Sequence, residues 1–72
     1  MELLEIKHTE RLSREQVAAR LRALADDLAR HNELEFTEGS TRIRVDVADE
    51  LELKVELEVE RDGVELEIEL KW

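Results

Sequence analysis

Apolar and polar residues alternate strictly through the last third of the chain, in two runs separated by Arg61-Asp62-Gly63. A period of two is typical of a strand with one buried face, and an Asp-Gly pair between two such runs signals a hairpin. The pattern predicts a long antiparallel hairpin whose apolar face is buried beneath a helix. The apolar positions are Leu51, Leu53, Val55, Leu57 and Val59, then Val64, Leu66, Ile68, Leu70 and Trp72.

Glutamate fills most of the other positions in these two runs. A two-residue turn at Asp62-Gly63 pairs Leu57 with Ile68 and keeps both apolar runs on one face. The same register sets acid against acid on the outer face, although like charges directly opposite are destabilising. The expected pairs are Glu60 with Glu65, Glu58 with Glu67 and Glu56 with Glu69.

A helix start is marked at Ser13, with Gln16 three residues later completing a capping box. Helical spacing then places Val17, Leu21, Leu24 and Leu28 on one stripe, with small alanines beside it. We expect the helix to end near His31-Asn32 and to lie against a sheet.

Two short strands follow, Leu34–Thr37 and Thr41–Val47, joined by Gly39-Ser40. A two-residue turn with glycine first suits a type II′ hairpin. This register places Phe36 opposite Ile43 on the inner face and Glu35 opposite Arg44 on the outer face. An apolar pair on one face and an opposite-charge pair on the other both favour this pairing of the strands. A turn at residues 48–50 would then pair the second of these strands with the long one that follows, setting Arg42 across from Glu56.

The segment Glu2–Lys7 is expected to be a first strand, with Leu4 and Ile6 inward. We expect it to lie antiparallel beside the last strand, because both are long. The alternatives are a place beside the second strand or pairing with another molecule. The whole chain, 1–72, then forms a single two-layer α+β domain in the order β-α-β-β-β-β, with one helix packed on a mainly antiparallel sheet.

Two stretches of the chain resemble the amphi-Trp domain family. They are Ser13-Arg14-Glu15-Gln16-Val17 through Leu21-Arg22-Ala23-Leu24-Ala25-Asp26, and the tail Glu67-Ile68-Glu69-Leu70-Lys71-Trp72. That family consists of small prokaryotic proteins with an amphipathic C-terminal stretch closed by tryptophan. The resemblance spans essentially the whole chain and implies a bacterial or archaeal source. It implies no activity, because no established function of the family carries over to these residues.

The charge balance is strongly acidic, with 20 acidic residues against 11 basic ones and a formal net charge of -9. Such a surface repels nucleic-acid phosphates and anionic membranes. It suits basic protein partners, cations or a cytoplasm of high salt concentration. The absence of cysteine fits a reducing compartment. No signal-peptide pattern or membrane-length apolar run occurs, so we expect a cytoplasmic protein.

The outer glutamates Glu56, Glu58, Glu67 and Glu69 form a candidate acidic surface for cations or a basic partner. A flat ladder offers carboxylates from one side only, whereas calcium takes six to eight oxygen ligands from a loop that wraps the ion. A solvated sheet face that discourages aggregation is the simpler interpretation.

Residues able to support catalysis are few. His8 and His31 have no cysteine near them and do not match a metal-ligand spacing, while Ser13 serves as a cap and Ser40 lies in a turn. No nucleophile–base set or phosphate-binding loop is present in the sequence. We therefore expect neither an enzyme nor a bound cofactor or metal.

One helix covers only part of a five-stranded apolar face. The positions left for a partner would be Leu51, Leu53, Leu70 and Trp72, which form a candidate interface. Trp72, expected opposite Leu53, would either close the core or anchor that interface. The favoured hypothesis is a self-associating interaction module, a homo-oligomer or the binder of a basic protein. A salt-responsive acidic protein and a small-molecule carrier with a helix–sheet pocket stay as alternatives.

Overall fold

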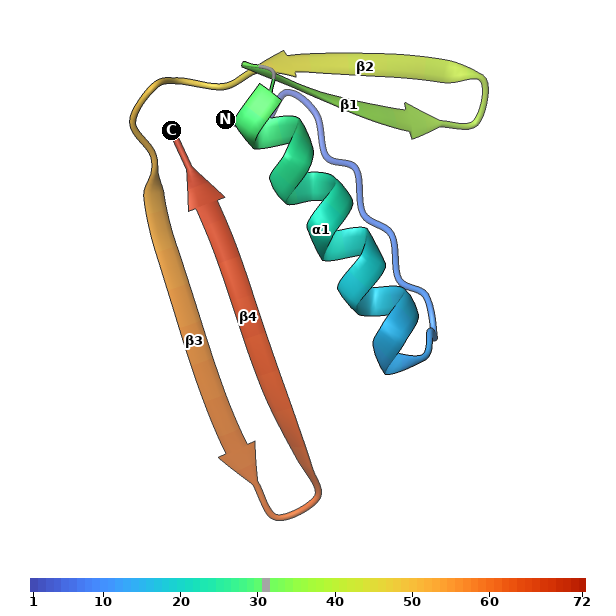
Figure 1. Ribbon diagram of the computed structural model, residues 1–72, viewed down its shortest axis with the longest axis vertical. Helices are drawn as coiled ribbons and strands as arrows, with labels where there is room; N and C mark the ends of the chain where they lie inside the picture. The colour runs from blue at the N-terminus through green and yellow to red at the C-terminus, as the bar shows by residue number, and fades with distance from the viewer. Residues whose placement is uncertain (31) are drawn as a thin grey trace.

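A computed structural model describes residues 1–30 and 32–72, which contain one helix and four strands (Figure 1). Helix α1 (Arg14–Arg30) precedes β1 (Glu33–Glu38), β2 (Thr41–Asp46), β3 (Glu52–Glu60) and β4 (Gly63–Lys71). The predicted α+β class and the order of the antiparallel strands after the helix are confirmed. The expectation of one continuous sheet is wrong, because the strands form two separate two-stranded sheets, β1–β2 and β3–β4.

The start of α1 is a reciprocal capping box, as the sequence predicts. The Ser13 backbone N–H donates to Gln16 Oε1 at 2.9 Å, and the Gln16 N–H donates to Ser13 Oγ at 3.1 Å. Both N–H groups would otherwise lack partners in the first turn. At the other end, Arg30 is the last helical residue described. The expected stop at His31-Asn32 falls partly outside the described residues, since His31 is not among them.

The β1–β2 hairpin has the predicted register. Phe36 faces Ile43 and Glu35 faces Arg44. Gly39 has φ +62, and no other described residue has a positive φ, which fits the type II′ turn that requires it only at the first loop position. The agreement follows from two constraints that act together, because turn geometry and the polarity of both faces select the same pairing.

The prediction of a first strand at Glu2–Lys7 is wrong. Residues 1–13 run as an extended segment beside α1, without strand pairing (Figure 1). Leu4 and Ile6 line one groove together with Phe36, Ile43 and Val45 of the β1–β2 hairpin. Because a strand requires a neighbour's backbone groups, a segment without such pairing is not part of either sheet.

The β3–β4 hairpin has a register shifted by two residues from the expected one. The loop consists of Arg61 and Asp62, so Glu60 faces Gly63. The predicted pairs of Glu60 with Glu65, Glu58 with Glu67 and Glu56 with Glu69 do not form. The observed polar pairs are Glu58 with Glu65, Glu56 with Glu67, Lys54 with Glu69 and Glu52 with Lys71.

Cross-strand charge explains the shift. The expected register sets Lys54 opposite Lys71, whereas the observed one gives each lysine a glutamate. An opposite-charge pair contributes roughly 0.2–1 kcal/mol, and a like-charge pair destabilises. The apolar side chains still share one face, since a shift of two residues preserves the alternation.

Very little of the described chain is buried. Leu34, 7% exposed, is the one buried hydrophobic residue in the described part of the chain. The molecule exposes 7196 Å² of surface. A compact monomer of 8.5 kDa would expose only about 4,700 Å². The radius of gyration, 14.3 Å, also exceeds the roughly 11 Å expected for 72 residues in a compact domain.

The helix does not cover the long hairpin, contrary to the sequence-based expectation. Among the described elements α1 contacts β1, and no Cα atom of α1 comes within 8 Å of a Cα atom in β3 or β4. The expected pairing of Arg42 with Glu56 is absent as well, because β2 and β3 are not neighbours in a sheet. Arg42 Nε instead lies 3.7 Å from Glu35 Oε1 on β1.

Candidate interaction surface

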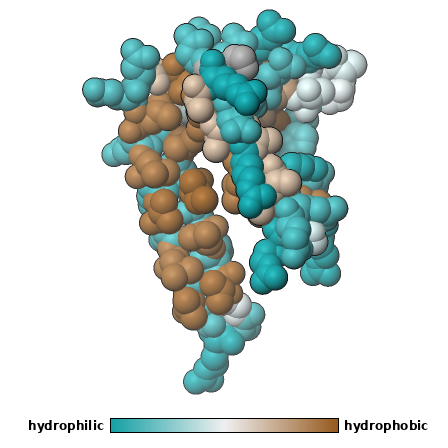
Figure 2. Space-filling view, in the orientation of Figure 1, coloured by the Kyte–Doolittle hydropathy of each residue, from teal (hydrophilic) through white to brown (hydrophobic). Residues whose placement is uncertain are grey.

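One face of the β3–β4 hairpin is apolar along its whole length and open to solvent. Figure 2 shows it as a continuous hydrophobic band along the hairpin. The two central leucines, Leu57 and Leu66, face each other and are 65% and 61% exposed. We call this surface the hairpin face; its members are Leu53, Val55, Leu57, Val59, Val64, Leu66, Ile68 and Leu70.

Exposure on the hairpin face rises towards the Arg61-Asp62 loop. Leu70, near the base, is half-buried, whereas Val59 and Val64 beside the loop are 69% and 70% exposed. Of the four interface residues predicted from sequence, Leu53 and Trp72 are largely open and Leu51 and Leu70 are half-buried. The central and loop-side positions are not among these four, because the helix was expected to cover them, although the same alternation marks them as apolar.

The base of the hairpin is joined to the end of β2 by a hydrogen bond, in which Trp72 Nε1 donates to the carbonyl oxygen of Asp46 at 2.8 Å. A separate bond, from the Val47 N–H to the carbonyl oxygen of Asn32 at 2.7 Å, extends the β1–β2 pairing beyond Glu33 and Asp46. Trp72 thus contacts the end of β2, and the expected place opposite Leu53 is taken by Leu70. The Trp72 bond holds one end of the β3–β4 hairpin, while the loop end extends away (Figure 1).

The opposite face of the hairpin carries the candidate acidic residues. Glu56 and Glu67 face each other, whereas Glu58 faces Glu65 and Glu69 faces Lys54. Lys54 Nζ also lies 3.3 Å from Glu56 Oε2. Within the described residues, no group of three or more His, Cys, Asp or Glu side chains could hold a metal ion. The geometry is that of a solvated, partly charge-paired face, and it brings no enclosed ligand set together.

Comparison with known protein families gives a match. The family model for the Amphi-Trp domain matches residues 1–72. The chain belongs to the Amphi-Trp domain family. The Amphi-Trp match thus covers every element of the fold, and the resemblance inferred from the sequence is confirmed. No curated protein and no solved structure gives a match.

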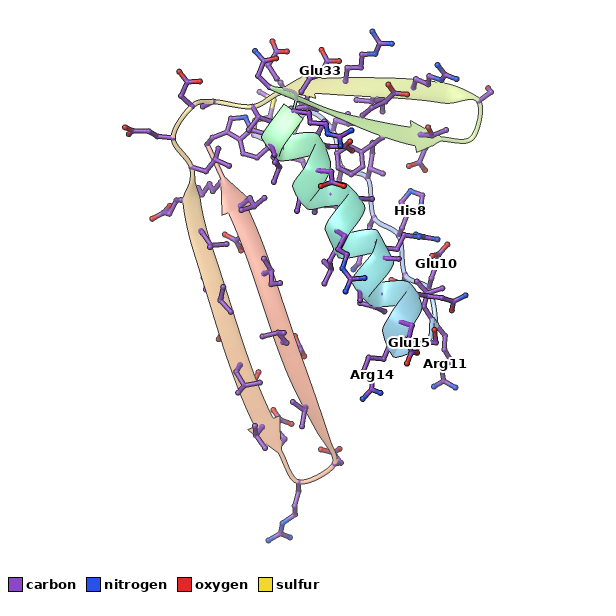
Figure 3. The ribbon with its side chains drawn as sticks, in the orientation of Figure 1. His8, Glu10, Arg11, Arg14, Glu15 and Glu33 are labelled. Carbon is purple, nitrogen blue, oxygen red and sulfur yellow. The ribbon has the colours of Figure 1, made fainter. Side chains whose placement is uncertain are left out.

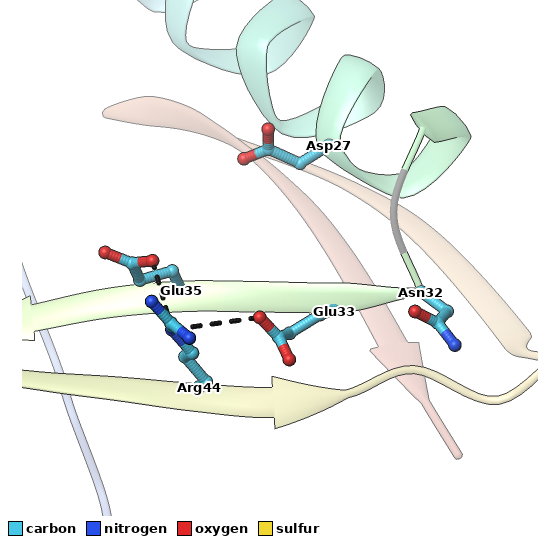
Figure 4. A pocket seen from close by; sticks show the side chains of 5 residues that line it. All are labelled: Asp27, Asn32, Glu33, Glu35 and Arg44. Carbon is cyan, nitrogen blue, oxygen red and sulfur yellow. Dashed lines mark ion pairs between the residues drawn. The ribbon is translucent and has the colours of Figure 1, made fainter.

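A polar depression lies where α1 of this Amphi-Trp domain meets β1 (Figure 4). Arg44 Nε lies 3.5 Å from Glu35 Oε2 and 3.8 Å from Glu33 Oε1, so one guanidinium serves two carboxylates. All three side chains are substantially exposed, so each pair contributes at most about 1 kcal/mol. The remaining lining residues are Asp27 and Asn32. Cross-strand pairing explains this cluster without a ligand.

The N-terminal segment adds charged contacts but no catalytic arrangement. Figure 3 labels His8 and Glu10 on this segment, beside the helix. Arg20 Nη2 lies 3.0 Å from Glu10 Oε2, which ties the segment to α1. His8 Nε2 lies 3.8 Å from Glu38 Oε2, with both side chains well exposed. The other histidine of the sequence, His31, lies outside the described residues, so the structure brings no histidine pair together in the part it describes.

A small apolar groove separates the N-terminal segment from the β1–β2 hairpin. Its volume is about 220 Å³, below the roughly 300–1,000 Å³ of typical small-molecule sites. The lining residues are Leu4, Ile6, Phe36, Ile43 and Val45, so no polar side chain could orient a ligand there.

In the described residues, no helix is both long and apolar enough to cross a membrane.

Proposed function

We propose that this Amphi-Trp domain is a small, non-enzymatic interaction module that self-associates through the hairpin face. The observation that carries the proposal is the exposure of an apolar surface along two nine-residue strands. Soluble monomers rarely present contiguous apolar patches beyond a few hundred Å² unless the patch is an interaction site.

The excess surface has the size of an obligate interface. The chain exposes about 2,500 Å² more than a compact monomer of its mass. Two chains that each cover this excess would bury about 5,000 Å² in total, at the upper end of the roughly 2,000–5,000 Å² that obligate homodimers bury over both partners. A second copy able to cover this excess would therefore bring the exposed area of each chain near that of an ordinary globular protein.

The β3–β4 hairpin also needs a neighbour for its own stability. An isolated two-stranded hairpin is marginally stable in water, and three strands or a packed element are usually required. Among the described residues β3 and β4 pair only with each other, and most of their apolar side chains are more than half exposed. Full burial of one leucine side chain contributes about 1.5–3 kcal/mol, so covering the hairpin face supplies the missing stabilisation.

Sedimentation velocity over the micromolar range tests the proposal. We expect the wild-type chain to sediment as an oligomer and the double variant Leu57→Gln/Leu66→Gln as a monomer. Both leucines are more than 60% exposed within one chain, so replacing them leaves the monomer's own packing largely intact. Far-ultraviolet circular dichroism checks that the helix persists.

The matched control is Glu58→Gln/Glu65→Gln. These residues also face each other across β3 and β4, one position along from the leucines and on the opposite face. The control should associate at least as well as the wild type, because it removes two negative charges from each chain. A wild-type chain that stays monomeric across the concentration range would refute the proposal.

A further inference from the structure

The helix carries a second apolar surface that the described residues cover only in part. Val17, Leu21 and Leu24 are 42%, 48% and 37% exposed, and Leu28 on the same side of α1 is half-buried. We call these four residues the helix stripe. Two open apolar surfaces on one chain, one helical and one stranded, raise the question of what covers each.

We propose that the helix stripe of one copy packs on the hairpin face of a second copy, and that its own hairpin face receives the second copy's helix. The arrangement is a two-fold dimer with two equivalent helix-on-hairpin contacts. This inference rests on the proposed self-association and specifies its geometry. In such a symmetric dimer, residue i of one chain contacts residue j of its partner and the reverse contact follows.

The dimensions of the two surfaces match. Helix α1 has 17 residues, a length of about 25 Å, and β3 and β4 have nine residues each, about 30 Å. A helix with its side chains is about 10 Å across, and two strands with their side chains span a similar width. One helix therefore covers one hairpin, with little apolar surface left at the sides.

The area to be buried favours this arrangement over stacking of two hairpins. Face-to-face stacking would cover one surface per chain and leave the helix stripe in water. The reciprocal arrangement covers two surfaces per chain, which better accounts for the excess of about 2,500 Å².

The net charges of the helix and of the hairpin also favour the helix-on-hairpin arrangement. Helix α1 contains four arginines against three acidic residues, whereas residues 52–71 contain eight acidic and three basic residues. A helix with a net charge of +1 approaching a hairpin of -5 is favourable, while two hairpins of -5 repel as they approach. The helix of a second copy is thus the better electrostatic match.

Cysteine cross-linking tests the geometry cleanly, because the sequence contains no cysteine. Two single variants, Leu21→Cys on the helix stripe and Leu66→Cys on the hairpin face, are prepared with tags of different size and oxidised alone and together. We expect the mixture to yield mainly the mixed-tag disulfide dimer, with little dimer from either variant alone. Efficient cross-linking of Leu66→Cys with itself would show stacked hairpins and overturn the inference while leaving self-association intact.

A double variant, Leu21→Cys/Leu66→Cys, distinguishes contacts between chains from closure within one chain. We expect disulfide-linked dimers, whereas an internal disulfide in a monomer would overturn the inference. Equilibrium sedimentation supplies a second readout. Leu21→Gln/Leu24→Gln should weaken association by on the order of 30-fold or more, as truncation of central interface residues does.

Ala19→Gln is the control on the helix, because Ala19 is exposed and lies opposite the helix stripe at helical spacing. It should associate as the wild type does. If Leu57→Gln/Leu66→Gln abolishes self-association and Leu21→Gln/Leu24→Gln leaves it unaffected, the helix-on-hairpin contact is rejected. Self-association through the hairpin face would then still stand. A monomeric wild type would reject both proposals.

Discussion

The indole Nε1 of Trp72 donates a hydrogen bond to the carbonyl oxygen of Asp46 at 2.8 Å, across 26 positions of sequence. The bond joins the end of β4 to the end of β2, so that the last residue of the sequence fixes the base of the β3–β4 hairpin (Figure 1). Because the indole N–H is the one hydrogen-bonding group of a tryptophan side chain, no other atom of this side chain could make the contact.

Trp72→Phe should therefore lower the free energy of unfolding. It keeps an aromatic ring but removes the donor, and a typical hydrogen bond contributes about 0.5–1.5 kcal/mol. Urea unfolding followed by circular dichroism at one fixed protein concentration measures the change, since self-association makes stability depend on concentration. Unchanged stability would mean that the bond to Asp46 makes no net contribution.

Ser13→Ala should destabilise α1. The substitution removes the Oγ that accepts from the Gln16 N–H, and loss of such a cap costs about 0.5–2 kcal/mol. Ser40→Ala is the matched control, because Ser40 is an exposed turn residue and surface substitutions usually stay within about 0.5 kcal/mol. Equal effects of the two variants in thermal unfolding would contradict the capping role.

The two glycines should respond differently to alanine. Gly39 has φ +62, where a side chain costs roughly 1–2 kcal/mol, so Gly39→Ala should destabilise. Gly63 has no positive φ, and an added Cβ there meets nothing within 4 Å. Gly63→Ala should therefore be neutral, or stabilising by about 0.4–1 kcal/mol through the unfolded chain. Urea midpoints of both variants measure the contrast, and a stability loss at Gly63 alone would contradict it.

Charge reversal tests the register of the long hairpin. Lys54 faces Glu69, so Lys54→Glu should destabilise by roughly 0.2–1 kcal/mol or more, and adding Glu69→Lys should restore most of the loss. In the register with an Asp62-Gly63 loop, Lys54 would face Lys71, and Lys54→Glu alone would stabilise. The sign of that single change in the free energy of unfolding discriminates between the two pairings.

Local features followed from the sequence where two independent constraints agreed. The Ser13–Gln16 capping box and the pairing of Phe36 with Ile43 involve residues close in the chain. In the first case side-chain chemistry and helical spacing coincide, and in the second turn geometry and the polarity of both faces coincide. Such short-range signals leave few competing structures.

The register of the β3–β4 hairpin was less determined. Alternation with a period of two permits any shift by two residues, because every such shift keeps the apolar face intact. The sequence therefore specified which side of the hairpin is apolar, while the pairing of Lys54 with Glu69 decided between registers of equal polarity. The charges in the sequence contain this information, because of the two registers only the observed one sets both Lys54 and Lys71 opposite a glutamate.

By itself, the sequence determined the helix, the four strands that follow it, the family and the apolar face of the long hairpin, because each depends on periodicity or on neighbours in the chain. Only the tertiary structure decided that the strands divide into two sheets and that α1 leaves the hairpin face uncovered. The physical reason is that an amphipathic pattern states which side must leave water but not what covers it. That choice depends on contacts between elements distant in sequence, and we propose that a second copy of the chain provides them.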